Sequence, residues 1–88
     1  MERIFKYPVP VTDFFTLELP TNYRILTVQI QYGDPYLWAV VNDEYSNTEA
    51  LFKLYGTGSP IDDHGERYVG TFQLRSLVFH LFHVQKLK

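Results

Sequence analysis

The sequence predicts an all-β fold, a small antiparallel β-sandwich or a partly open barrel of about seven short strands. Three observations support this prediction. Short runs of β-branched and aromatic residues recur at hairpin spacing, separated by turn residues. Over most of residues 23–32, apolar and polar side chains alternate with a period of two. No heptad pattern, internal repeat or low-complexity block is present.

The first half of the chain contains four predicted strands, over residues 4–9, 15–19, 23–32 and 36–41. In the third strand, the alternation places Leu26, Val28, Ile30 and Tyr32 on one face. Gly33-Asp34-Pro35 predicts a turn that joins the third and fourth strands into a hairpin. Because the fourth strand is apolar on both faces, we expect it at the centre of a sheet and covered from two sides.

The second half contains three more predicted strands, over residues 49–55, 68–74 and 77–84. The first of these could also form one or two helical turns, but its neighbours favour a strand. Residues 56–66 form the longest irregular stretch, and residues 85–88 are expected to be a solvated tail. Lys6, Pro8 and Pro10 near the first strand are expected to protect one edge of a sheet. The other edge is expected to pair with a second copy of the chain.

Length and composition exclude several classes of protein. Eighty-eight residues make one domain, residues 1–88. Eight Lys and Arg against ten Asp and Glu leave a net charge of −2, so direct nucleic-acid binding is not expected. No apolar run reaches the roughly 20 residues of a transmembrane helix, and no membrane partner is expected. The absence of cysteine excludes disulfides and thiol chemistry.

The string Tyr55-Gly56-Thr57-Gly58-Ser59-Pro60 is the first candidate binding site. Two glycines beside hydroxyl residues can expose several backbone N–H groups together, a nest that suits phosphate or carboxylate. The string is not a P-loop, because it lacks the Gly-Lys-Ser/Thr group and a following helix. The alternative, which we favour, is a wide hairpin loop whose glycines have positive φ.

Metal and catalytic sites find little support. Asp62-Asp63-His64 contains hard-metal ligand types, but no second cluster accompanies it, so a solvated loop is the better interpretation. A catalytic set of Ser59, His80 and Asp62 has no distinctive spacing. We therefore expect no enzyme activity, no catalytic residue, no metal and no cofactor.

The aromatic content is the strongest anomaly. Seven Tyr, seven Phe and one Trp exceed what so small a core can hide, so several rings should be exposed. On the last strand, Phe79 and Leu81 are expected to face the core, while His80 and Phe82 face outward. His80, Phe82 and Trp38 are candidates for an aromatic surface that contacts a partner or a ligand. His83 is expected to lie inward or at the strand end.

Several segments together resemble a family of small, uncharacterised proteins found largely in phages and prophages. The resemblance rests on Arg3-Ile4-Phe5-Lys6-Tyr7-Pro8, Leu26-Thr27-Val28-Gln29, Leu37-Trp38-Ala39-Val40-Val41, Tyr55-Gly56-Thr57-Gly58-Ser59-Pro60-Ile61, Tyr68-Val69-Gly70-Thr71-Phe72-Gln73 and Leu77-Val78-Phe79-His80-Leu81-Phe82. His83 and the tail to Lys88 depart from that pattern. The resemblance implies a phage accessory protein in the cytoplasm of the bacterial host and carries over no catalytic role.

Three hypotheses for function follow. The first is a non-enzymatic counter-defence inhibitor, comparable to anti-CRISPR proteins, that blocks a host immune protein through an aromatic sheet face. The second is a sponge that sequesters a cyclic or ADP-ribose-type nucleotide signal, with the loop of residues 55–60 holding phosphate and Trp38 or a tyrosine stacking on the base. The third is a structural or assembly protein of the virion. The first two are compatible with a homo-oligomer.

Overall fold

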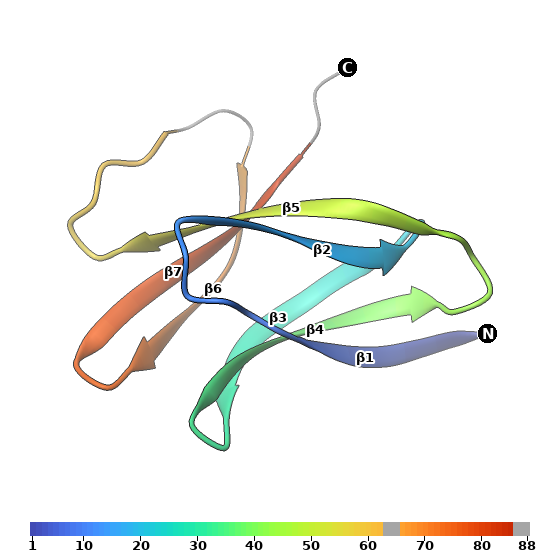
Figure 1. The fold of residues 1–88 in the computed structure, drawn as a ribbon, viewed down its shortest axis with the longest axis horizontal. Helices are drawn as coiled ribbons and strands as arrows, with labels where there is room; N and C mark the ends of the chain where they lie inside the picture. Colours follow the sequence, from blue (N-terminus) through green and yellow to red (C-terminus); the bar gives the residue numbers. More distant parts are fainter. Residues whose placement is uncertain (63–65, 86–88) are drawn as a thin grey trace.

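The computed structural model describes residues 1–62 and 66–85 and contains seven strands (Figure 1). The strands are β1 (Glu2–Pro8), β2 (Phe14–Pro20), β3 (Arg24–Gln31), β4 (Asp34–Asn42), β5 (Asn47–Gly56), β6 (Glu66–Leu74) and β7 (Leu77–Val84). Every paired strand is antiparallel to its neighbour. The all-β prediction is confirmed, and so is the strand at residues 49–55 that could have been helical. Among the described residues no helix is long and apolar enough to cross a membrane.

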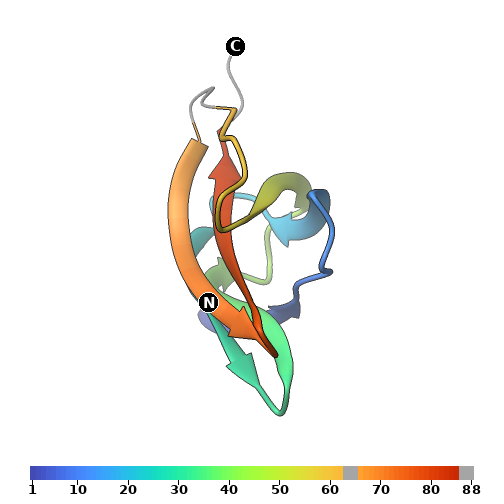
Figure 2. The same ribbon diagram turned by 90° about the vertical axis from the view of Figure 1, so that its left-hand side faces the viewer.

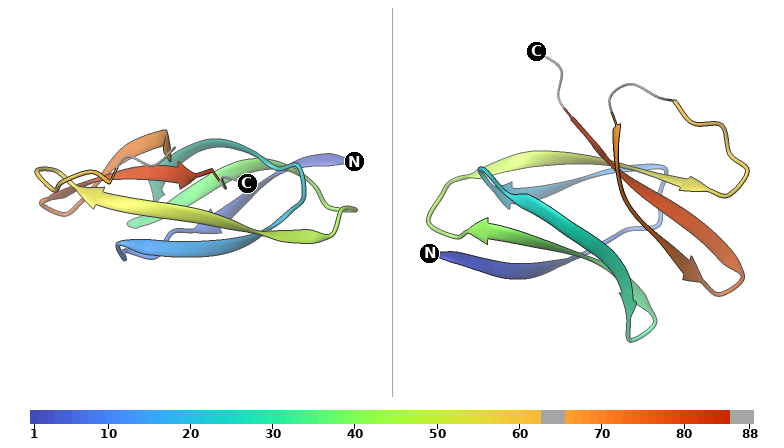
Figure 3. Two further views of the ribbon diagram at one scale, coloured as in Figure 1. Left: turned by 90° about the horizontal axis from the view of Figure 1, so that it is seen from above. Right: turned by 180° about the vertical axis from the view of Figure 1, so that it is seen from behind.

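The strands form two sheets that are not closed into a barrel. One sheet has the order β1-β4-β3 and the other the order β2-β5-β7-β6. The molecule is flat, 39 × 36 × 16 Å, as expected when two sheets stack about 10 Å apart (Figure 2 and Figure 3). β3 is an edge strand of the first sheet and β6 an edge strand of the second, and these two edges lie side by side. The edges β1 and β2 lack a hydrogen-bonded neighbour on one side.

The core lies between the two sheets and is built from alternate residues of each strand. Phe52, Leu37 and Leu81 are completely buried, and the Phe15 ring stacks on Phe52 at 5.2 Å. The other core members are Val9, Leu19, Val28, Ala50, Leu54 and Phe72. The predicted excess of exposed rings is confirmed, since Phe5, Phe14, Tyr32, Tyr45 and Tyr68 are all more than a third exposed.

The turn between β3 and β4 lies one residue earlier than predicted. Tyr32 and Gly33 have φ values of 54° and 85°, and β4 already begins at Asp34. Two consecutive positive φ values are typical of a type I′ turn, whose twist matches that of a hairpin. Tyr32 is consequently 93% exposed and does not share a sheet face with Val28.

Two β-bulges interrupt the edge strands that face each other. The register of β3 shifts between Ile25 and Thr27, and that of β6 shifts between Tyr68 and Gly70. The bulge places Leu26, which is 43% exposed, outside the predicted alternation. A bulge inserts one extra residue, so the residues after it alternate again but point to the opposite faces. The alternation in the sequence alone therefore does not show where a bulge lies.

β4 is the central strand of its sheet, as predicted, but it is covered on one face only. Leu37, Ala39 and Val41 are buried against the other sheet. Trp38 and Val40 point to the outer face and are half-buried. The prediction that both faces are covered was wrong, because neighbouring side chains of the same sheet shield these apolar groups. The Tyr36 ring, for example, contacts Trp38 edge-on at 6.2 Å.

Candidate functional site

The loop after β5 folds against the outer face of the four-stranded sheet and creates two adjacent hollows. The larger, of about 320 Å³, includes Asp13, Phe14 and Pro60 among its lining residues. The smaller, of about 260 Å³, includes Ile61, Tyr68 and Phe82. Eight of the nine predicted site residues line one or both: Tyr55, Gly56, Thr57, Gly58, Ser59, Pro60, His80 and Phe82. Residues distant in the sequence therefore meet on one face.

The smaller hollow, which we call the aromatic hollow, has rings along its floor. Phe82 on β7 lies between two tyrosines of the neighbouring strands. Its ring centroid is 5.5 Å from that of Tyr55 on β5 and 5.6 Å from that of Tyr68 on β6, both edge-on. Because the three rings stand on adjacent strands of one sheet, their positions are fixed by the strand register. Tyr68 and Ile61, each 56% exposed, form part of its rim.

His80 lies at the centre of a chain of hydrogen-bonded side chains beside this hollow. Its Nε2 is 2.8 Å from Thr57 Oγ1, and its Nδ1 is 2.9 Å from Thr71 Oγ1. Thr71 Oγ1 in turn lies 2.6 Å from the Tyr68 hydroxyl. Both ring nitrogens of His80 are thus hydrogen-bonded to threonines. The catalytic set of Ser59, His80 and Asp62 considered from the sequence would need a different partner for this histidine.

The glycine loop is a tight turn whose amides are partly used within the chain. The Ser59 N–H donates to the Gly56 carbonyl at 3.1 Å, and the Thr57 N–H donates to the Val78 carbonyl at 3.1 Å. Gly58 has a φ of 94°, as the third residue of a type II turn requires. These two amides are therefore not offered to an anion, which favours the turn interpretation over a phosphate nest at this loop.

A cluster of charged and phenolic groups fastens the loop to the sheet. The Glu66 side chain is 2% exposed, and its carboxylate lies 3.0 Å from Lys53 Nζ. The Tyr55 hydroxyl donates to Glu66 at 2.9 Å and accepts from the Asp62 N–H at 3.4 Å. Hydrogen bonding to Glu66 raises the pKa of Lys53, while burial and then that same carboxylate raise the pKa of Tyr55.

This cluster was not found from the sequence, because Lys53 and Glu66 look like separate surface charges. The only signal was the alternation of β5, which places Lys53 and Tyr55 on one face. Lys53 also lies 3.5 Å from Asp62, so one ammonium links β5, the loop and β6.

Trp38 does not join the other predicted site residues. It lies on the outer face of the three-stranded sheet, beside Tyr36, because its neighbours Leu37 and Ala39 fill the core. His80 and Phe82 flank the buried Leu81 and point outward from the four-stranded sheet. Trp38 and the aromatic hollow are therefore on opposite sides of the molecule. The prediction that Trp38, His80 and Phe82 share one surface was wrong.

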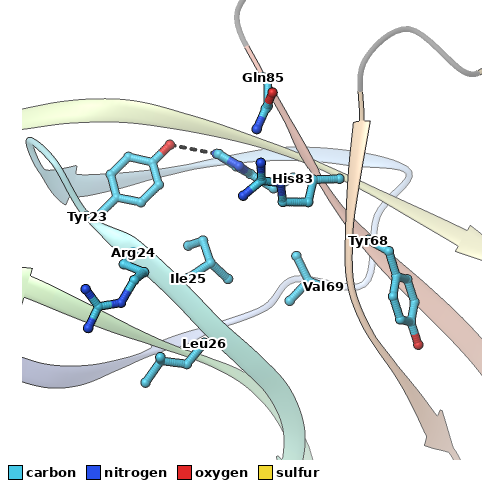
Figure 4. Close-up of a pocket in the computed structure, with 9 residues that line it drawn as sticks. Tyr23, Arg24, Ile25, Leu26, Tyr68, Val69, His83 and Gln85 are labelled. Carbon is cyan, nitrogen blue, oxygen red and sulfur yellow. Dashed lines mark hydrogen bonds between the residues drawn. The ribbon is translucent and has the colours of Figure 1, made fainter.

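A third hollow, which we call the edge cleft, lies between β3 and β6 and was not predicted. It has a volume of about 380 Å³ and is lined by Tyr23, Arg24, Ile25, Leu26, Arg67, Tyr68, Val69, His83 and Gln85. In Figure 4 the side chains of Ile25 and Val69 extend toward each other between the two strands. The Tyr23 hydroxyl is hydrogen-bonded to His83. Arg24 extends from the side of β3 that faces away from β6.

His83 is half-buried at one end of the edge cleft. Its ring packs against Phe52 at 5.2 Å and lies edge-on to Tyr23 at 5.5 Å. Burial, and then the positive charge of its cross-strand partner Arg67, lowers the pKa of His83. The sequence indicated an inward histidine here, but Tyr23 and Arg67 come from segments that only the fold brings together.

The metal-site hypothesis concerns residues of which two, Asp63 and His64, lie outside the described residues. Elsewhere, in residues 1–62 and 66–85, no group of three His, Asp or Glu side chains is placed to hold a metal ion.

Comparison with known proteins identifies one family. A family model described as a domain of unknown function, DUF7352, matches residues 1–88. No curated protein matches the chain, and no solved structure does.

Proposed function

The chain belongs to the DUF7352 family, and we propose that it is a non-enzymatic binding protein that blocks another protein through the aromatic hollow. The observation that carries this proposal is the convergence of Tyr55, Tyr68 and Phe82 with Ile61 at one solvent-open depression. Aromatic side chains that already sit in fixed positions lose little conformational entropy on binding, and such residues dominate the energetics of protein interfaces.

The shape of the hollow suits an apolar anchor from a partner. Its volume of about 260 Å³ fits one large side chain better than a complete small ligand, since small-molecule sites span roughly 300–1,000 Å³. The Thr57 hydroxyl and the His80 imidazole line it with groups that can donate or accept hydrogen bonds. An apolar centre with a polar rim is the usual anatomy of an interface.

We further propose that the blocked partner is an immune protein of a bacterial host and that the protein acts in the host cytoplasm. The support is the resemblance to small phage and prophage proteins, together with a near-neutral charge that does not suit direct binding to nucleic acid. A blocking protein needs a rigid contact surface, and the three fixed rings of the aromatic hollow offer one.

The test uses bacteria that carry one defined defence system each, challenged with a phage which that system restricts. Expression of the protein is expected to restore plating in at least one such strain. Ile61→Glu places a charge at the rim and should abolish the restoration, whereas Ile4→Glu, at a similarly exposed position on β1, should preserve it. Full activity of Ile61→Glu, with equal protein levels, would exclude the aromatic hollow as the blocking surface.

We also propose that the chain self-associates along β2. This strand lacks a neighbour on one side, carries Phe14 at 53% exposure and has no lysine to discourage pairing. Native mass spectrometry of the purified protein should show a dimer, and Thr16→Pro, in the middle of β2, should reduce it to a monomer. A wild-type monomer at micromolar concentration would exclude this arrangement.

A further inference from the structure

We propose that the edge cleft between β3 and β6 binds the phosphate group of a small organic phosphate of mononucleotide size. The inference goes beyond the proposed function, because its charged and hydrogen-bonding residues, Arg67, Arg24, Tyr23 and His83, line the edge cleft and not the aromatic hollow.

The backbone around the edge cleft is built differently from the rest of the sandwich. β3 and β6 are the facing edges of the two sheets, and they lie side by side without forming a hydrogen-bonded ladder. Each carries a bulge, and both bulged residues, Leu26 and Val69, line the cleft. Edge strands and bulges leave backbone N–H groups without a partner from the sheet, and bulges are frequent next to binding sites.

The side chains around the edge cleft favour an anion. Arg24 and Arg67 are both among its lining residues, and no Asp or Glu is among them. In the part of the chain that the structure describes, neither arginine has a carboxylate within ion-pair distance. Because Arg24 extends away from β6 in Figure 4, Arg67 is the arginine placed to meet an anion in the cleft. Arginine presents a planar set of donors that matches phosphate in a bidentate way.

The hydrogen-bonding groups at the end of the cleft strengthen this preference. The Tyr23 hydroxyl and His83 Nε2 are held 2.7 Å apart, and Gln85 adds an amide. Arg67 is the cross-strand partner of His83, so its guanidinium group belongs to the same end of the cleft. A phosphate placed there would find a cation beside two neutral groups that are already positioned.

Size and wall chemistry extend the inference from phosphate to an organic phosphate. The volume of about 380 Å³ lies in the lower part of the range for small-molecule sites, roughly 300–1,000 Å³. Ile25, Leu26 and Val69 provide an apolar wall on which a nucleoside could lie. Inorganic phosphate alone would leave this wall in contact with water, so a ligand with an apolar or aromatic part should bind more tightly.

The experiment is an amide NMR titration of the full chain with AMP, inorganic phosphate and adenosine as separate probes. AMP is expected to shift the amides of residues 24–26 and 67–69 and to bind at least tenfold more tightly than adenosine, which corresponds to about 1.4 kcal/mol. Inorganic phosphate should shift the same amides at higher concentration. Equal affinity for phosphate and AMP would overturn the proposal that the ligand is of mononucleotide size. Tighter binding of adenosine than of AMP would overturn the proposal that the cleft binds a phosphate group.

Two arginine variants separate a specific site from general electrostatic attraction. Arg67→Gln should weaken AMP binding at least tenfold, whereas Arg75→Gln, the same change of charge in the β6–β7 turn, should alter it less than twofold. Equal weakening by both variants, or no shift with millimolar AMP, would overturn the proposal. Neither result would bear on the aromatic hollow, which is tested by Ile61→Glu.

Discussion

The Tyr23 hydroxyl and His83 Nε2 lie 2.7 Å apart and connect the two sheets across 60 residues of sequence (Figure 4). Tyr23 directly precedes β3 in one sheet, and His83 belongs to β7 in the other. Each side chain is partly buried, and burial raises the pKa of Tyr23 while it lowers that of His83. Both shifts favour the neutral forms, so the pair is a hydrogen bond between uncharged groups near neutral pH.

The lowered pKa of His83 predicts that the protein loses stability on mild acidification. An unfolded histidine titrates near 6.5, and the folded one titrates lower. Between these two values the unfolded chain binds more protons, so the free energy of unfolding falls as the pH drops below 6.5. Urea unfolding at several pH values should show this slope. His83→Gln should reduce this dependence of the free energy of unfolding on pH, and His80→Gln should retain it. An unchanged dependence in His83→Gln would show that His83 is not its source.

Gly70 is predicted to tolerate a small side chain poorly. A Cβ atom at this position would lie 2.9 Å from Val28 Cγ1, in the region where β6 packs on β3. Gly70→Ala should therefore lower the free energy of unfolding by about 1–3 kcal/mol, the usual cost of overpacking. Gly56→Ala is the matched control, because its Cβ would meet only Ser59 Oγ at 3.7 Å. Equal stability of the two variants would contradict this prediction, since it would mean that Val28 and β3 can move away from the added methyl group.

The Tyr55 hydroxyl is predicted to stabilise the fold more than the Tyr68 hydroxyl does. The Tyr55 hydroxyl donates to the buried Glu66 carboxylate, whereas the Tyr68 hydroxyl is hydrogen-bonded to the exposed Thr71. A hydrogen bond to a charged group contributes about 1.5–3 kcal/mol and an exposed neutral one about 1 kcal/mol or less. Chemical denaturation of Tyr55→Phe and Tyr68→Phe should reproduce this order, and the reverse order would contradict the role given to Glu66.

Local patterns were sufficient to predict most of the fold. Alternation and turn residues give the seven strands, because a sheet face selects residues with a period of two. The placement of Phe79 and Leu81 toward the core and of His80 and Phe82 outward follows from the same rule. The rule failed at Leu26 and Tyr32, where a bulge and a type I′ turn reset the alternation.

The candidate sites could be predicted only in part. The glycine loop and the strand with His80 were each visible in the sequence, and the strand order β5-β7-β6 brings them together. The edge cleft was not predictable, since it depends on which edges face each other. Arg67 and His83 are partners across β6 and β7, and Tyr23 joins them because β3 lies beside β6. Trp38 was misplaced for the same reason, because alternation within a strand does not tell which sheet the strand joins.

The assignment of strands to sheets also determines the order in which the protein can assemble during synthesis. All partners of the three-stranded sheet lie within residues 2–42, so that sheet can pair as soon as Asn42 has left the ribosome. β2 is made early but must wait for β5, with Phe14 opposite Lys53. Until then the inner face of the first sheet, with Leu37 at its centre, stays open to water. The apolar face of residues 2–42 is therefore covered completely only after β5, β6 and β7 have all been made.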